Sequence, residues 1–194
     1  FLPPKEPDPM PLDFVDRLFD PPQVERVPHV FTLGAGTPPR PAELNWHMVL
    51  ASHAGQQRFF VVGPWTSAGE VHYPKDADIV WIKFKLGVYF SHWPTYEIVN
   101  QETPLVQAVG QKFWLHKTTW SVPTYDNADT FVTRLAREGT LAYDPVVGAV
   151  LNGEPTHLAE RTVRQRFLHA TGLTQGQIRQ VQRAQQAAAY LAAG

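Results

Sequence analysis

The stretch from His157 to Gly194 begins with a short basic helix whose side chains can hydrogen-bond to the edges of DNA bases. Three apolar residues, Val163, Phe167 and Ala170, recur at the spacing of one helix face and are expected to face a core. The opposite, exposed face then carries Arg161, Arg164 and Gln165. An arginine can pair bidentately with guanine and a glutamine with adenine, so a helix with this face can discriminate between bases.

A tight turn and a second helix are expected after this stretch. Gly172 suits the left-handed position that ends a helix, and Thr174 suits the N-cap of a helix from Gln175 to about Ala193. This order indicates a helix-turn-helix whose recognition helix enters a DNA major groove. The alternative is an ordinary helical hairpin with a solvated arginine face, because charged runs are usually only solvent-exposed.

The stretch Glu160-Arg161-Thr162-Val163-Arg164-Gln165-Arg166-Phe167, followed by Ala170-Thr171-Gly172-Leu173, resembles the first helix-turn-helix of the AraC family of bacterial transcription regulators. Further upstream the chain resembles family members with an N-terminal cupin-like sensor. The segments that carry this second resemblance are Val61-Val62-Gly63-Pro64, Trp81-Ile82-Lys83-Phe84, Phe113-Trp114-Leu115 and Asn127-Ala128-Asp129-Thr130-Phe131-Val132. The resemblance extends from about Asn45 to the C-terminus.

The resemblance implies a sequence-specific DNA-binding regulator that senses a small-molecule effector. By alignment to the family pattern, Arg161, Arg164 and Gln165 take the base-facing positions. Arg166 and the helix start at Thr174 and Gln175 are expected to contact phosphates. The expected partners are DNA and an effector, and a second copy of the chain is a further candidate.

One feature departs from the family pattern. Members of the AraC family carry two helix-turn-helix units joined by a linker helix. The 194 residues contain only the first unit and the linker. We therefore expect a fragment with weak DNA affinity by itself, because specific sites gain affinity from two or more modules. A fragment that binds a partner but no DNA is an alternative.

Composition limits the class of protein. There is no cysteine, which excludes disulfides, thiolate metal ligands and a cysteine nucleophile. No apolar run reaches 18 residues, so we expect no membrane span, and the absence of cysteine fits the cytoplasmic location that we expect. Residues 1–143 hold 12 Lys and Arg against 15 Asp and Glu, a net charge of −3, whereas residues 144–194 hold 5 against 3, a net charge of +2. This asymmetry has the direction expected of a sensor joined to a DNA-binding part.

The pattern predicts an α+β protein in three parts: a proline-rich N-terminal arm (1–43), a cupin-like β-barrel or roll ending in a helix (44–139) and a partial DNA-binding domain (140–194). Eleven of the 18 prolines precede residue 42, and residues 12–19 between them are expected to form one or two helix turns. Strands are expected at 45–52, 57–62 and 79–85, and helices at 128–137 and 146–151.

Aromatic residues on the predicted strands are candidates for lining a ligand cavity, and Trp46, Trp65, Trp81 and Phe84 are the ones we select. The alternative is that these rings fill the core. The eight histidines raise the possibility of a metal-dependent cupin-type enzyme with a structural helical tail, but the chain contains no His-x-His pair. His47 and His53 are nonetheless expected to share a strand face. We predict no catalytic residue, no metal ligand, no cofactor and no enzymatic activity.

Overall fold

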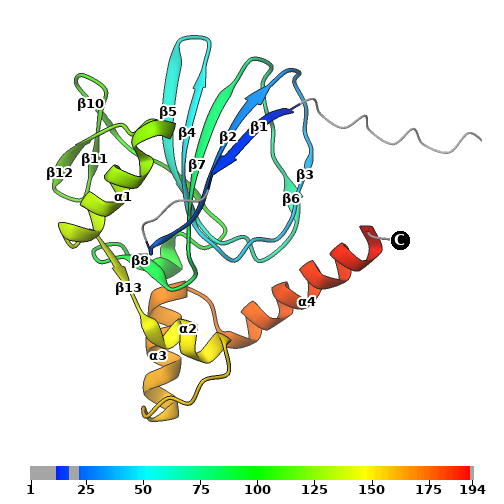
Figure 1. Cartoon of the computed structure of the whole chain (residues 1–194), viewed down its shortest axis with the longest axis vertical. Helices are drawn as coiled ribbons and strands as arrows, with labels where there is room; N and C mark the ends of the chain where they lie inside the picture. Colours follow the sequence, from blue (N-terminus) through cyan, green and yellow to red (C-terminus); the bar gives the residue numbers. More distant parts are fainter. Residues whose placement is uncertain (1–11, 18–21, 193–194) are drawn as a thin grey trace, which may run out of the picture.

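The computed structural model describes residues 12–17 and 22–192, and over these residues the protein has a mixed α+β fold (Figure 1). Strands make up most of the N-terminal part, and helices predominate after residue 128. This confirms the predicted α+β class, with strands before helices. Within the described ranges, no helix is both long enough and apolar enough to cross a membrane.

One antiparallel sheet of six strands forms the centre of the N-terminal part. In spatial order its strands are β1 (Leu12–Arg17), β2 (Val24–Thr32), β7 (Asp78–Phe84), β4 (His47–His53), β5 (Gln56–Val62) and β9 (Glu102–Pro104). In the described part of the chain β1 and β9 are open edges of this sheet, so the expected barrel is not closed there.

Three smaller sheets and the helices surround this sheet. The small sheets pair β3 (Pro39–Arg40) with β6 (Gly69–Glu70), β8 (Val88–Phe90) with β13 (Leu141–Tyr143), and β11 (Lys112–Leu115) with β10 (Gln107–Ala108) and β12 (Thr118–Ser121). The helices are η1 (Thr95–Glu97), η2 (Tyr125–Asn127), α1 (Ala128–Arg137), α2 (Pro145–Leu151), α3 (Glu160–Thr171) and α4 (Gln175–Ala192).

Both faces of the six-stranded sheet bury side chains. One face joins α1 in a cluster that we term the sheet core, which includes Met48, Phe59, Ile82, Val132 and Leu135. The other face carries a smaller cluster, which includes Val49, Val62, Ile79, Trp65 and Trp81. Because successive side chains of a strand point to opposite faces, neighbouring residues of β4, β5 and β7 belong to different clusters.

The N-terminal segment differs from the prediction. The helix turns expected at residues 12–19 are wrong over Leu12–Arg17, which forms β1, and residues 18 and 19 lie outside the described part of the chain. The arm expected over residues 1–43 includes β2, which lies between β1 and β7 in the sheet. Pro28 lies inside β2, where it pairs with Asp16 of β1 but has no partner in the register with β7; its nitrogen has no hydrogen to donate.

Local signals predicted the four α-helices correctly, but not the short helices η1 and η2. α1 has the predicted bounds, and Gly139 follows it at φ +72°. Asp144 caps α2 by accepting a hydrogen bond from the backbone N–H of Val146 at 2.9 Å. Gly172 ends α3 in the left-handed conformation, at φ +70°. The Thr174 hydroxyl accepts a hydrogen bond from the backbone N–H of Gln177 at the start of α4. Each of these features depends on a few neighbouring residues, which is why the sequence reveals it.

The helices are joined to the sheet region by a third cluster, which we term the helix core. It contains Leu44, Val147, Phe167, Ala170, Leu173, Ile178 and Val181. The hydroxyl of Thr95 in η1 donates a hydrogen bond to the carbonyl of His169 in α3 at 2.5 Å. β13, which follows the predicted boundary at residue 139, pairs with β8. The two regions thus share apolar packing and hydrogen bonds.

Gly63 fixes the approach of η1 to the end of β5. A Cβ at this position would lie 1.6 Å from the carbonyl oxygen of Ile98. Gly63→Ala must therefore displace backbone, and we expect it to lower the free energy of unfolding by about 3 kcal/mol in urea denaturation.

Gly55→Ala is the matched control. Gly55 has φ +74°, but a Cβ there meets no atom within 4 Å. We expect Gly55→Ala to lower the free energy of unfolding by about 1 kcal/mol, which is the cost of holding an alanine in the left-handed backbone conformation. Equal losses in the two variants would contradict the steric argument.

Candidate functional site

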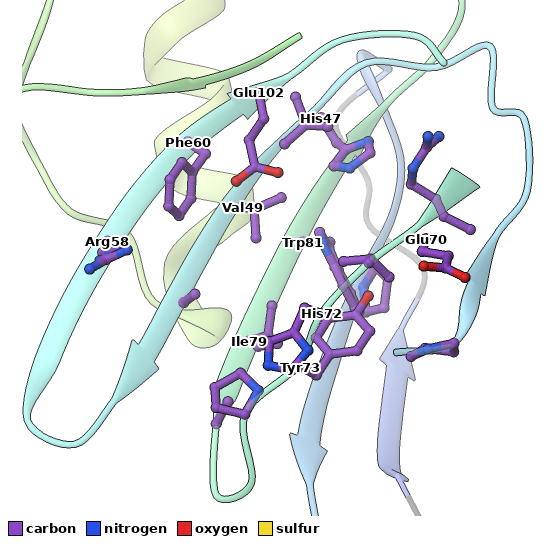
Figure 2. A pocket seen from close by; sticks show the side chains of 18 of the residues that line it. His47, Val49, Arg58, Phe60, Glu70, His72, Tyr73, Ile79, Trp81 and Glu102 are labelled. Atoms are coloured by element: carbon purple, nitrogen blue, oxygen red, sulfur yellow. The ribbon is translucent and has the colours of Figure 1, made fainter. Parts of the chain in front are cut away.

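A cavity of about 940 Å³ lies on the face of the six-stranded sheet opposite the sheet core (Figure 2). β4, β5 and β7 supply its floor, and the paired strands β3 and β6 with residues 71–74 supply a wall. Its size is typical of sites that bind small molecules.

The floor of the cavity is mostly apolar and aromatic. Figure 2 shows Val49, Phe60, Ile79 and Trp81 projecting from neighbouring strands into the same space. These residues lie at alternate positions along their strands, opposite in direction to Met48, Phe59 and Ile82 of the sheet core. The sheet therefore offers a planar ligand a wide apolar surface.

One ion pair lies in the cavity. The ammonium of Lys83 donates a hydrogen bond to Oε1 of Glu43 at 2.5 Å. The two side chains are only 14% and 25% exposed. Each charge is neutralised by the other, so this part of the floor presents no unpaired charge.

His47 is the most buried polar residue of the cavity. It is 6% exposed, and its Nδ1 atom has no hydrogen-bond partner in the described structure. Burial lowers the pKa of His47 from 6.5 to about 4; the charge of Glu43 opposes this effect, and that of Lys83 adds to it. The imidazole is thus uncharged at neutral pH, and its Nδ1 atom is buried without a hydrogen-bond partner.

The remaining polar groups lie against aromatic rings. Burial raises the pKa of Tyr73 to about 12, with smaller contributions from the carboxylates of Glu102 and Glu43, so its phenol stays protonated. Tyr73 meets Trp81 edge to face, with ring centroids 6.3 Å apart. The guanidinium of Arg40 lies over the ring of Trp65, 3.8 Å from its centroid, as a cation–π pair.

Two of the four predicted pocket residues line the cavity, and two do not. Trp65 and Trp81 line it. Trp46 and Phe84 belong to the sheet core, where their rings stack with centroids 4.1 Å apart and the indole of Trp46 donates to the carbonyl of Val88 at 2.6 Å. The prediction is wrong for Trp46 and Phe84 because strand alternation turns them to the opposite face.

Several residues of the site were not predicted from the sequence. Glu43, Lys83 and Tyr73 line the cavity but were not selected. The alternation of Ile79, Trp81 and Lys83 is a signal that could have identified Lys83, whereas Glu43 and Tyr73 reach the cavity from irregular segments.

The cavity also contains three histidines. His47 and His53 line it from one face of β4, as predicted, and His72 from the opposite wall. Across residues 12–17 and 22–192, no group of three or more His, Cys, Asp or Glu side chains is arranged to hold a metal ion.

The predicted base-reading residues lie together on the outer face of α3. Arg161, Arg164 and Gln165 are exposed, whereas Val163 and Phe167 on the inner face are buried. Arg164 forms an ion pair with Glu160 one turn earlier, with Nη2 and Oε1 2.7 Å apart, and both side chains remain largely exposed. Exposed pairs of this kind are weak and can exchange for another anion.

Arg166 occupies a different place from the other arginines of α3. Its guanidinium donates two hydrogen bonds to the carboxylate of Asp144, from Nε at 2.9 Å and from Nη2 at 2.8 Å. Asp144 is buried and caps α2, so this bidentate contact ties α3 to the start of α2. The phosphate contact expected of Arg166 would have to compete with this pair.

Thr174 and Gln175 lie at the start of α4. The hydroxyl of Thr174 bonds with Gln177 in a capping box, and Gln175 is half-buried. Both residues lie at a helix N-terminus, where a phosphate is favoured electrostatically.

Comparison of this chain with models of known protein families, with curated proteins and with solved structures finds no match.

His47 should make the protein sensitive to acid. Between pH 6.5 and about 4 the unfolded chain binds a proton at His47 and the folded chain does not. Acid therefore favours the unfolded chain, and the free energy of unfolding decreases as the pH falls through that window. The slope is roughly 1.4 kcal/mol per pH unit, which gives about 2 kcal/mol between pH 6.5 and 5.

Urea denaturation at pH 7 and pH 5 measures this loss. We expect His47→Leu to lose less stability than the wild type on acidification, because the variant lacks the buried imidazole. His53→Leu, an exposed position that lines the same cavity, is the control and should behave as the wild type. An unchanged acid response in His47→Leu would contradict the burial argument.

Proposed function

We propose that this chain belongs to a sequence-specific DNA-binding regulator of the AraC type, with a cupin-like sensor region that binds a small-molecule effector. The observation that carries the proposal is the outer face of α3, on which the three predicted base-reading residues are exposed together. An α-helix fits the major groove of B-DNA, and arginine and glutamine are suited to bond with guanine and adenine there.

The packing of α3 supports the proposal. Its inner face is buried in the helix core through Phe167 and Ala170, and Arg166 links it to Asp144 at the start of α2. Its C-terminal end packs on η1, where a Cβ on Gly172 would lie 2.8 Å from the carbonyl oxygen of Thr95. A helix fixed at three places can present its outer side chains in a constant orientation, as base recognition requires.

The segment from Arg40 to Leu44 suggests how an effector would influence the helices. Arg40 and Glu43 line the cavity, whereas Leu44 belongs to the helix core. The carbonyl of Ala42 accepts a hydrogen bond from the side chain of Gln185 in α4 at 2.9 Å. A ligand that changes the positions of Arg40 and Glu43 would therefore act on residues that contact the helices within the same short segment.

DNA recognition is tested with duplexes selected by the protein from a random library. We expect Arg164→Ala to weaken binding to the selected sequence by about tenfold to a hundredfold and binding to random DNA far less, because one bidentate base contact provides about 1–3 kcal/mol of discrimination. Titrations at several salt concentrations measure both affinities and separate base contacts from phosphate contacts.

Arg137→Ala is the matched control, since it removes the same charge from an exposed position on α1. This control should lower the affinity for the selected sequence and the affinity for random DNA slightly and by the same factor. Equal losses on the two DNAs in Arg164→Ala would reduce this residue to a phosphate contact. If the protein selects no sequence from the library, the alternative of a chain that binds a partner rather than DNA is favoured.

A further inference from the structure

The polar groups deep in the cavity are either neutral or already paired. His47 and Tyr73 are uncharged at neutral pH for the reasons given above. Lys83 and Glu43 neutralise each other, and the guanidinium of Arg40 is stacked on Trp65. Among His47, Tyr73, Lys83 and Glu43 no formal charge lacks a partner, whereas the half-buried guanidinium of Arg40 lies over a ring and has no carboxylate partner among the described residues.

A charged ligand group would be disfavoured at this depth. To pair with Lys83 or Glu43 it would have to displace the other member and leave that charge unpaired in a mostly buried place. Without such displacement it would lose its hydration and gain no counter-charge. An uncharged ligand incurs neither cost.

Two features indicate what an uncharged ligand would need. Phe60, Tyr73 and Trp81 provide aromatic surfaces that favour another planar ring by stacking or edge contact (Figure 2). The unpartnered Nδ1 of His47 needs a hydrogen-bonding group, because a buried polar atom without a partner is unfavourable.

We propose that the cavity binds an uncharged aromatic or heteroaromatic molecule with a polar group that hydrogen-bonds to His47. This inference rests on the proposed function, in which the molecule is the effector.

The mouth of the cavity differs from its floor. Arg58, Glu70 and Glu102 are exposed and carry charges of both signs (Figure 2). Water screens charges at such positions, so they place little restriction on substituents of the ligand that extend outward. We therefore expect the floor of the cavity, and not its mouth, to distinguish charged from uncharged ligands.

Three probes of nearly equal size and shape test the charge preference: benzamide, which is neutral, benzoate, an anion, and benzamidine, a cation. Their dissociation constants are measured at pH 7 by ligand-observed NMR titration of the whole chain. We expect benzamide to bind at least about tenfold more tightly than either charged probe.

Variants test the position and the hydrogen bond. His47→Leu should weaken benzamide binding by about fivefold or more, whereas His157→Leu, at an exposed position outside the cavity, should leave it unchanged. Ala51→Trp fills the cavity from its β4 floor and should abolish binding of benzamide. Thermal melts of each variant establish that the fold is retained.

The proposal is overturned if benzoate or benzamidine binds as tightly as benzamide, if none of the three probes binds, or if Ala51→Trp binds benzamide normally. It is also overturned if His47→Leu is folded and binds benzamide like the wild type. The DNA titrations use no probe, so a failure of the regulator proposal in those experiments is distinguishable from a failure of the ligand class.

Discussion

The six-stranded antiparallel sheet buries side chains on both faces, and their alternation determines which residues fill the core and which line the cavity. Met48, Phe59 and Ile82 pack against α1, and their immediate neighbours Val49 and Trp81 face the cavity. A shift of one residue in register would exchange the core and the cavity surface, so the register is fixed on both sides at once. The cavity is thus a consequence of the same packing that stabilises the sheet.

The helical region depends on the sheet region for part of its apolar core. Leu44 precedes β4, yet it packs with Val147 and Phe167 of the helices. The close approach of Gly63 to Ile98 and the bond from Thr95 to His169 support the same junction. Since packed interiors are dense and transmit displacement, a change in the cavity wall is expected to reach α3 and α4 through a short path.

Charged residues divide into those that hold the structure and those that remain available. The pairs of Lys83 with Glu43 and of Arg166 with Asp144 each fix one element to another. Arg161 is exposed, and the contact of Arg164 with Glu160 is a weak surface pair. The arginines of α3 thus have different roles although they lie within six residues of one another, and only their direction on the helix separates them.

The sequence by itself determined the α+β class and the C-terminal helices, because capping residues, prolines and glycines such as Asp144 and Gly172 act within one or two turns. It also identified Trp65 and Trp81 as residues of a cavity. Tertiary structure decided that the proline-rich segment contributes β2, that Trp46 and Phe84 fill the core, and that Glu43, Tyr73 and Lys83 meet His47. These outcomes depend on strand pairing and on the face of the sheet that each side chain occupies, which are contacts between residues far apart in the chain.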